Sequence, residues 1–214
     1  MMRHICIVCE GQTETAFVNR CLVPHLIHYN VYPHARILQA PSGSHRGGRV
    51  SVERISKHIS HEFSSYDRIS TLTDLYGFED GNNRTRAELE DAILTDVEQR
   101  TTQFDARFVL PYVQPYEFEA LLFSNIEAFH WVLDAWNDTA RSTLQSIRDA
   151  FNTPEDINDG PQTAPSKRIS KCFRGAYSKT EHGPLIAEEI GLDVIRDQCP
   201  AFDGWIGALE QWGD

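Results

Sequence analysis

The sequence lacks any hydrophobic run long enough to cross a membrane, because its 214 residues contain no stretch of about 20 consecutive apolar residues. The apolar run nearest the N-terminus, residues 5–8, is also shorter than the roughly 7–15 residues of a signal-peptide core. We therefore expect a cytoplasmic protein that has no membrane partner.

The sequence also lacks a disulfide framework. Its five cysteines lie at positions 6, 9, 21, 172 and 199, and an odd, dispersed set does not form a disulfide framework. Cys6 and Cys9 have the C-x-x-C spacing, but residues three apart on a strand point to opposite faces. We expect buried thiols here and no redox or zinc chemistry.

Positive charge is scarce too, since 20 Lys and Arg stand against 31 Asp and Glu, for a net charge of −11. This balance excludes a protein that coats nucleic acid through charge alone. It does not exclude a metal-dependent nuclease, because carboxylates around a cation add to the negative count. The glycines of residues 43–48 do not form a Walker-type ATP motif.

What is present is the composition of an ordinary globular protein, 41% hydrophobic and 24% charged. Runs of β-branched and apolar residues predict strands over residues 4–9, 35–40, 66–75 and 106–113. Apolar residues three and four apart predict helices over residues 13–27, 50–64 and 84–100, the first with Thr13 as its N-cap. This alternation predicts an α/β fold with a four-stranded parallel-type sheet flanked by helices.

After Pro115 the pattern becomes helical, starting with residues 116–122 and 126–136. A polar stretch with proline and aspartate, residues 151–164, predicts an exposed loop. Near the C-terminus an i, i+3, i+4, i+7 set of apolar residues predicts the buried face of a helix: Phe202, Trp205, Ile206 and Leu209. We interpret residues 1–124 as an α/β core and residues 125–214 as a mainly helical extension that packs on it as one structural unit.

Carboxylates follow several of the predicted strands. Glu10 comes directly after the first strand, Asp74 ends the third, and Glu14 lies about one helical turn from Glu10. Glu117 and Glu119 follow the fourth strand. Parallel strands end at one edge of a sheet, where ligands bind, so converging carboxylates predict a Mg²⁺ or Mn²⁺ site. The alternative is that Glu14, Glu117 and Glu119 only complement helix dipoles.

Three groups of residues carry a family resemblance. Val8-Cys9-Glu10-Gly11-Gln12-Thr13-Glu14 resembles the opening motif of Toprim domains, most of all in the overcoming-lysogenisation-defect nucleases. Thr73-Asp74-Leu75-Tyr76-Gly77-Phe78 occupies the place of the Toprim Asp-x-Asp motif. The segments 115–123, 166–168 and 199–205 resemble a bacterial family with a Toprim-like domain of unknown function (DUF4276), over nearly the whole chain.

The resemblance implies roles for individual residues. Glu10 would be the metal-proximal carboxylate and general acid or base, Asp74 a metal ligand, and Glu14 part of a second ion site. The second aspartate of the Asp-x-Asp pair is Tyr76 here, and phenol is a poor Mg²⁺ ligand. Three other carboxylates are candidates for the missing ligand: Asp80, Glu117 and Glu119. If none serves, the site binds one ion or is inactive.

A phosphodiester substrate also requires cations. Residues 161–180 contain five basic and no acidic residues, and Lys167 and Arg168 are the preferred phosphate contacts, with Lys167 the candidate catalytic cation. Lys179, Arg46 and Arg49 are further candidates for phosphate or nucleic-acid binding. The alternative is that the basic segment is a solvated helical face.

These features lead to a first hypothesis of a metal-dependent Toprim-type nuclease that cleaves DNA or RNA. By family analogy it would be the effector of a bacterial anti-phage defence system, acting with a separate ATPase subunit. The second hypothesis is a non-enzymatic interaction or sensor subunit of an ATPase complex. A phosphohydrolase or nucleotidyl transferase for small substrates stays open as a third, and homo-oligomerisation is compatible with all three.

Overall fold

The computed structural model describes residues 1–38, 50–79, 84–158, 160 and 162–214. It divides into two compact units, the first made of Met1–Gln114 with Trp205–Asp214 and the second of Pro115–Gly204. The boundary expected after residue 124 stays a prediction. Among the described residues, no helix is both long and apolar enough to span a membrane.

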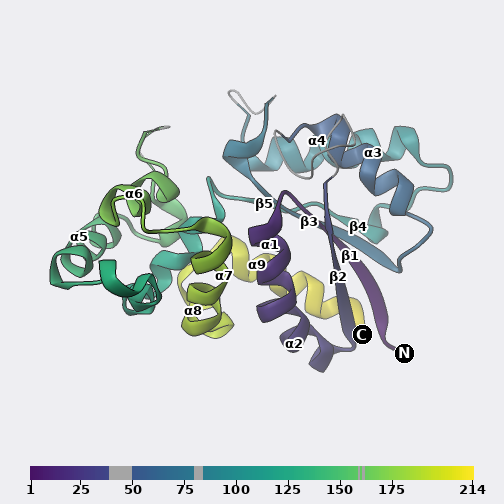
Figure 1. Ribbon diagram of the computed structural model, residues 1–214. Coiled ribbons are helices and arrows are strands. Elements are labelled where there is room, and N and C mark those ends of the chain that lie inside the picture. Colours follow the sequence, from purple (N-terminus) through teal and green to yellow (C-terminus); the bar gives the residue numbers. More distant parts are fainter. Residues whose placement is uncertain (39–49, 80–83, 159, 161) are drawn as a thin grey trace. The chain divides into compact units, whose positions relative to one another are not determined.

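The first unit is built on a parallel sheet with the strand order β2-β1-β3-β4, in which a short β5 also pairs with β3 (Figure 1). The strands are β1 (Arg3–Cys9), β2 (Val31–Ile37), β3 (Arg68–Asp74), β4 (Val109–Leu110) and β5 (Val113–Gln114). The helices are α1 (Gln12–Phe17), α2 (Val23–Leu26), α3 (Val52–Glu62) and α4 (Arg86–Arg100). This architecture confirms the predicted fold class.

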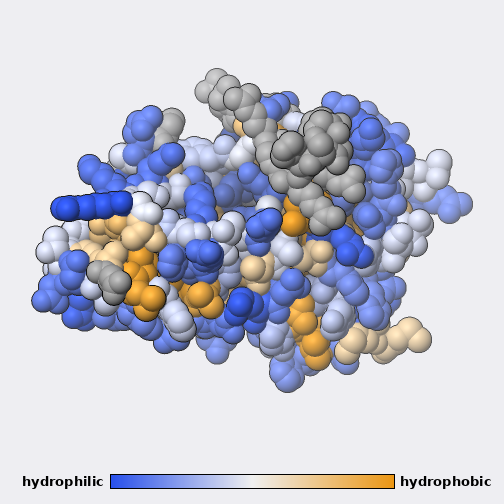
Figure 2. All heavy atoms as spheres, viewed as in Figure 1, coloured by the Kyte–Doolittle hydropathy of each residue, from blue (hydrophilic) through white to orange (hydrophobic). Residues whose placement is uncertain are grey.

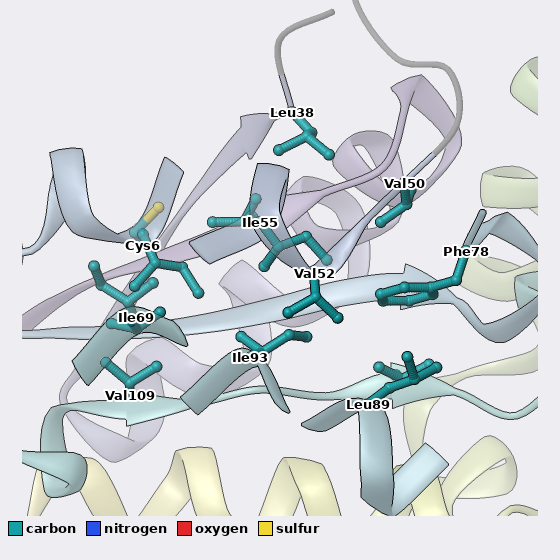
Figure 3. Close-up of a cluster of buried hydrophobic side chains, with 14 residues drawn as sticks. Cys6, Leu38, Val50, Val52, Ile55, Ile69, Phe78, Leu89, Ile93 and Val109 are labelled. Atoms are coloured by element: carbon teal, nitrogen blue, oxygen red, sulfur yellow. The ribbon is translucent and has the colours of Figure 1, made fainter. Parts of the chain in front are cut away.

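Helices cover both faces of this sheet (Figure 1). On one face, α3 and α4 pack against each other and enclose a cluster of buried side chains (Figure 3). Val52 and Ile55 of α3 and Leu89 and Ile93 of α4 meet the strand residues Cys6 and Ile69 there. On the other face lie α1, α2 and the C-terminal residues of α9 (Pro200–Glu210).

The C-terminal residues are fastened to the sheet by Trp205. Its indole stacks on Tyr112 with ring centroids 4.5 Å apart, and its Nε1–H donates to Ser70 Oγ at 2.8 Å. The predicted apolar face is confirmed, because Phe202, Trp205, Ile206 and Leu209 are all buried.

Three prolines explain where the strands and helices differ from the expectation. Pro111 splits the expected fourth strand into β4 and β5, with a 3₁₀ turn, Ala106–Phe108, before them. Pro24 has no backbone N–H to donate to a helical hydrogen bond. The helix expected over residues 13–27 is accordingly divided into α1, a π-helical segment Val18–Leu22, and α2. Strand β2 starts four residues earlier than expected and contains Pro33, which an edge strand tolerates.

The described residues of the second unit form helices joined by turns and irregular segments, and no strand. It contains α5 (Asp138–Asp149), α6 (Pro165–Cys172), α7 (Lys179–Ile190), α8 (Leu192–Gln198) and the first residues of α9, together with 3₁₀ segments. The segments Phe118–Ser124 and Ile126–Ala135 are 3₁₀ helices, where regular helices were expected.

The described residues of the expected loop over residues 151–164 are irregular except for the 3₁₀ turn Pro154–Asp156, but the segment is not exposed throughout. Pro154, Glu155, Ile157 and Ala164 are buried. Glu155 accepts hydrogen bonds from the backbone N–H groups of Ala201 and Phe202, at 2.8 and 3.0 Å, and so caps the start of α9. The surface shown in Figure 2 is mostly hydrophilic, with hydrophobic residues in small separate patches, as expected when the apolar residues fill the core.

Candidate metal centre at the end of the strands

Glu10 is placed by the end of β1. Its backbone N–H donates to Leu72 O at 3.3 Å, which continues the pairing of β1 with β3 for one more residue. Its carboxylate reaches along the ends of the strands, where Oε2 accepts from the backbone N–H of Asp74 at 3.4 Å. The Glu10 carboxylate therefore meets the backbone of Asp74, the residue that the sequence assigned to the neighbouring strand end.

Gly77 makes room for the Glu10 carboxylate. A Cβ at residue 77 would lie 2.4 Å from Glu10 Oε2 and 3.0 Å from its Cδ, which is closer than atoms approach without a shift. The backbone at this point is held in place, because Val50 N–H donates to Gly77 O at 2.9 Å and Glu79 N–H donates to Val50 O at 2.8 Å. Any side chain at residue 77 would displace the carboxylate of Glu10.

Glu14 is buried, and its carboxylate serves the start of helix α1. Its Oε2 accepts from the backbone N–H of Gly11 at 2.9 Å, across the first turn of α1. Gly11 is the N-cap of this helix, so the expectation that Thr13 holds that place was wrong. The predicted dipole role and the predicted metal role of Glu14 therefore fall on the same carboxylate, of which one oxygen is used by the helix.

Asp74 and Tyr76 form the turn after β3. Asp74 is half-buried and precedes the 3₁₀ turn Leu75–Gly77, whereas the Tyr76 side chain is 39% exposed. The place that a second motif aspartate would take is thus held by an aromatic side chain at the surface.

The residues of this unit fit a hard cation in the type of their donors. Glu10, Glu14 and Asp74 offer carboxylate oxygens, and Mg²⁺ binds through one or two carboxylates while it keeps waters and substrate phosphates. Within the described residues, no three His, Cys, Asp or Glu side chains form a group ready to enclose a metal ion. Asp80, Arg46 and Arg49 lie outside the residues that the structure describes.

A second cluster of carboxylates lies in the helical unit. Tyr116, whose φ of 57° is unusual for a residue with a side chain, turns the backbone just before Glu117. Glu117 accepts from Ser166 N–H at 2.8 Å and from Ser166 Oγ at 2.9 Å. Lys179 Nζ lies 3.1 Å from Glu119 Oε1 and 3.9 Å from Glu117 Oε1.

Glu119 is almost fully buried, with only 2% of its side chain exposed. Burial raises the pKa of its carboxyl from 4.5 to about 7; the positive charge of Lys179 lowers it and the negative charge of Glu117 raises it. This cluster therefore contains its own cation, and Glu119 titrates near neutral pH.

The predicted phosphate contacts have different surroundings. Lys167 is exposed in the first turn of α6. Arg168 is half-buried, donates from Nε to Thr163 O at 2.6 Å, and lies over the ring of Phe151 at 5.4 Å. Lys179 pairs with the carboxylates just described. The sequence did not predict that Gly77 makes room for Glu10 or that the Ser166 hydroxyl donates to Glu117. Of these two, only Gly77 had a signal in the sequence, because a glycine three residues after Asp74 is typical of a tight turn.

Comparisons with known proteins agree with the fold. The profile of a family described as Domain of unknown function (DUF4276) matches residues 9–210. No curated protein matches the chain. The chain is similar to two solved structures of the C-terminal region of the OLD protein from Xanthomonas campestris pv. campestris, at 16% sequence identity to each. Both matches cover 100% of this chain. The first covers 96% of the solved chain with a TM-score of 0.50, and the second covers 98% with a TM-score of 0.45. At this identity the likeness of the first concerns the fold alone.

Proposed function

We propose that this protein is a metal-dependent nuclease, which cleaves phosphodiester bonds in DNA or RNA with Mg²⁺ or Mn²⁺. The chain belongs to the DUF4276 family, and the proposal is based on this membership and on the carboxylates at the strand ends. The observation that carries the proposal is the contact of Glu10 Oε2 with the backbone of Asp74, beside Gly77, whose missing side chain leaves room for that carboxylate. Glu10 and Asp74 stand at neighbouring strand ends, and carboxylates that come close there repel each other unless a cation is bound.

Each residue at the strand ends has a separate task in this proposal. Glu10 and Asp74 would hold the cation, and Glu14 would assist through the oxygen that the helix does not use. A bound Mg²⁺ or Mn²⁺ would supply charge stabilisation for the phosphate and an activated water. Glu10 is also the group that would take a proton, since it is fixed from two sides, by the Asp74 N–H and by Gly77.

The proposal has three further parts: an ATPase partner, a role in defence and the phosphate contacts. The sequence has no Walker-type motif, so an ATPase activity would have to come from another domain or subunit. A role as the effector of an anti-phage defence system follows from the family resemblance alone. Lys167 and Arg168 are the proposed phosphate contacts, of which Lys167 is the more accessible.

The test combines calorimetric titration with Mn²⁺ and cleavage of single-stranded DNA, duplex DNA and RNA. We expect Glu10→Gln and Asp74→Asn each to weaken Mn²⁺ binding by roughly tenfold or more and to abolish cleavage. Glu98→Gln, which changes an exposed carboxylate on α4 of the same unit, is the matched control and should behave like the wild type. Cleavage that persists unchanged in both site variants would overturn the proposal.

A second function, a non-enzymatic interaction or sensor subunit of an ATPase complex, is favoured by one observation. Tyr76 occupies the position of the second motif aspartate and is 39% exposed, as a contact residue would be. Wild-type protein that binds Mn²⁺ but cleaves none of these substrates, with or without an ATPase partner, would support this function over the nuclease.

A further inference from the structure

A stripe of rings and one guanidinium runs along strand β2, which lies at one edge of the sheet. Tyr32, His34 and Arg36 alternate along β2 and so point to the same side. His4 of β1 and Tyr66, just before β3, join them. We call these five residues the edge stripe. Its ring centroids are 5.7 Å apart for His4–Tyr32, 5.2 Å for His4–His34, 5.0 Å for Tyr32–His34 and 5.4 Å for His34–Tyr66.

Polar contacts hold these rings in place. His4 Nδ1 and His34 Nε2 are 2.9 Å apart, a hydrogen bond that needs at least one neutral imidazole. Arg36 Nε donates to Tyr66 Oη at 3.0 Å, and its guanidinium lies 5.9 Å from the centre of that ring. Burial, with the charges of His4 and Arg36, lowers the pKa of His34. The edge stripe is therefore an ordered aromatic surface that carries a permanent cation at neutral pH.

The open edge of β2 is unsuited to another strand. Arg3 N–H donates to Asn30 O and Leu38 N–H donates to Cys9 O, so the backbone groups of the even-numbered residues of β2 hydrogen-bond to β1. The backbone N–H and C=O groups of the odd-numbered residues face the open edge. Pro33 is one of the outward residues and has no N–H to offer. A proline at this position protects an edge from pairing with another strand. Beside the edge is a hollow lined by β2 residues and by Asn19 and Val23.

We propose that the edge stripe binds single-stranded nucleic acid by stacking unpaired bases on its rings. Successive same-face residues of a strand are about 6.6 Å apart, and every base has a π-face that aromatic side chains can stack on. Arg36 adds a positive charge for the phosphates in a chain whose net charge is −11. The choice of nucleic acid as the polymer rests on the proposed function, which the stripe would extend by favouring unpaired strands over duplexes.

The test measures binding without cleavage. Fluorescence anisotropy with a labelled oligothymidine of about 20 nucleotides, longer than the ~4–16 nucleotides that one small domain covers, is recorded in EDTA. We expect His34→Leu and Tyr66→Leu each to weaken binding roughly five- to a hundredfold, as the loss of a stacking partner does. Tyr66→Phe, which keeps the ring but removes the hydroxyl that accepts from Arg36, should weaken binding less than Tyr66→Leu. Lys57→Gln, which removes an exposed cation on α3, is the control and should bind within about twofold of the wild type.

An abasic strand of the same length separates stacking from charge. The wild type should prefer the thymidine strand, and His34→Leu should lose that preference while Arg36→Gln weakens both strands alike and lowers the salt dependence. Thermal unfolding of each variant shows whether the fold is intact, and Tyr32→Phe against Tyr32→Leu repeats the comparison at a second ring. An equal affinity of the wild type for both strands, or binding unaffected by every ring variant, would overturn the inference.

The outcome is separable from that of the proposed function. The binding test contains no metal, and its ring and Arg36 variants change only residues of the edge stripe, so its result does not depend on what Glu10→Gln and Asp74→Asn do to cleavage. Loss of binding in Lys167→Ala with full binding in all edge-stripe variants would place the nucleic acid on the basic segment and refute the stripe without touching the metal proposal. Binding through the stripe with no cleavage would leave the inference standing and the nuclease refuted.

Discussion

The two carboxylate clusters of this protein solve the same electrostatic problem in different ways. At the strand ends, Glu10 and Glu14 accept backbone N–H groups, from Asp74 and Gly11. In the helical unit, Glu119 instead faces the ammonium group of Lys179. Backbone donors satisfy single oxygens but carry no full charge, whereas the second cluster holds an ammonium group, so we expect the first cluster to respond more to an added cation.

This difference decides what each cluster can reveal in experiments. A metal ion added to the protein should act first on the carboxylates of the strand ends, because Lys179 already pairs with those of the helical unit. The carboxylates of the helical unit should respond to pH and to changes at Lys179, because their charges are matched within the protein. Each of the following predictions tests one side of the comparison.

The largest effect is expected from Lys179→Met, which leaves Glu119 buried without its cation. We expect the free energy of unfolding at about pH 8 to fall by about 2 kcal/mol, less than the ~3–5 kcal/mol for a fully buried pair, because 47% of the Lys179 side chain is exposed. Urea unfolding in EDTA measures this. Lys171→Met, at an exposed lysine of α6, should cost less than about 0.5 kcal/mol, and an equal loss in both variants would contradict the role of the pair.

The pH dependence of stability should come from the same carboxyl group. Because the pKa of Glu119 is about 7 in the folded protein against an ordinary 4.5, the folded state binds more protons than the unfolded chain between these values. Its contribution to stability is therefore complete below about pH 4.5, falls as the pH rises to about 7, and is level above.

Glu119→Gln isolates this contribution, since the amide does not titrate. Relative to this variant, the wild type should lose on the order of 2 kcal/mol of unfolding free energy between about pH 5 and about pH 8. Urea unfolding at both pH values gives the difference. Parallel pH profiles for the two proteins would show that Glu119 is ionised throughout and that Lys179 compensates its burial fully.

The strand ends show how far the sequence could predict the site. The β-branched run before Glu10 and the run that ends at Asp74 predicted two parallel strands, and their register brings these residues together. Which backbone groups the carboxylates meet could not be predicted, because a turn such as Leu75–Gly77 is set by contacts with residues distant in sequence. Val50, which precedes α3 and donates its backbone N–H to Gly77 O, is one of these.

The helical unit was predicted less well, for a physical reason. Its residues 151–164 are polar and contain proline, which in isolation is typical of a loop, yet Glu155 is buried because it caps α9, more than 40 residues later. Local sequence does not contain that partner. Lys179 is a second example. The sequence predicted it as a phosphate contact, whereas in the structure it pairs with Glu119, 60 residues earlier in the chain.

A smaller effect is expected from Gly77→Ala, which displaces the Glu10 carboxylate at the strand ends without removing any carboxylate. The added Cβ would lie 2.4 Å from Glu10 Oε2, and because that atom ends a flexible side chain, the carboxylate should move and the fold should persist. We expect Mn²⁺ affinity to drop roughly tenfold, with an unfolding free energy within about 1 kcal/mol of the wild type.

Gly207→Ala is the matched control for this substitution. Gly207 lies in α9 within the same unit, and a Cβ there meets nothing within 4 Å. Alanine at this helical position should stabilise the protein slightly, by up to about 1 kcal/mol, and leave Mn²⁺ binding unchanged. If Gly77→Ala bound Mn²⁺ as tightly as Gly207→Ala, the position of the Glu10 carboxylate would not matter for metal binding.

The smallest effect is expected from Tyr76→Asp, which restores the second carboxylate of the Asp-x-Asp pattern. Tyr76 is exposed, so the exchange should cost little stability, whereas an added oxygen ligand beside Asp74 should tighten Mn²⁺ binding by roughly three- to tenfold. Titration calorimetry of this variant against Tyr76→Asn separates the charge from the loss of the ring. Tighter binding in Tyr76→Asp alone would mean that the strand ends accept a further carboxylate around the cation. Unchanged binding would mean that the ligand set is completed elsewhere, and the contrast with the internally neutralised cluster of the helical unit would then rest on Glu10 and Asp74 alone.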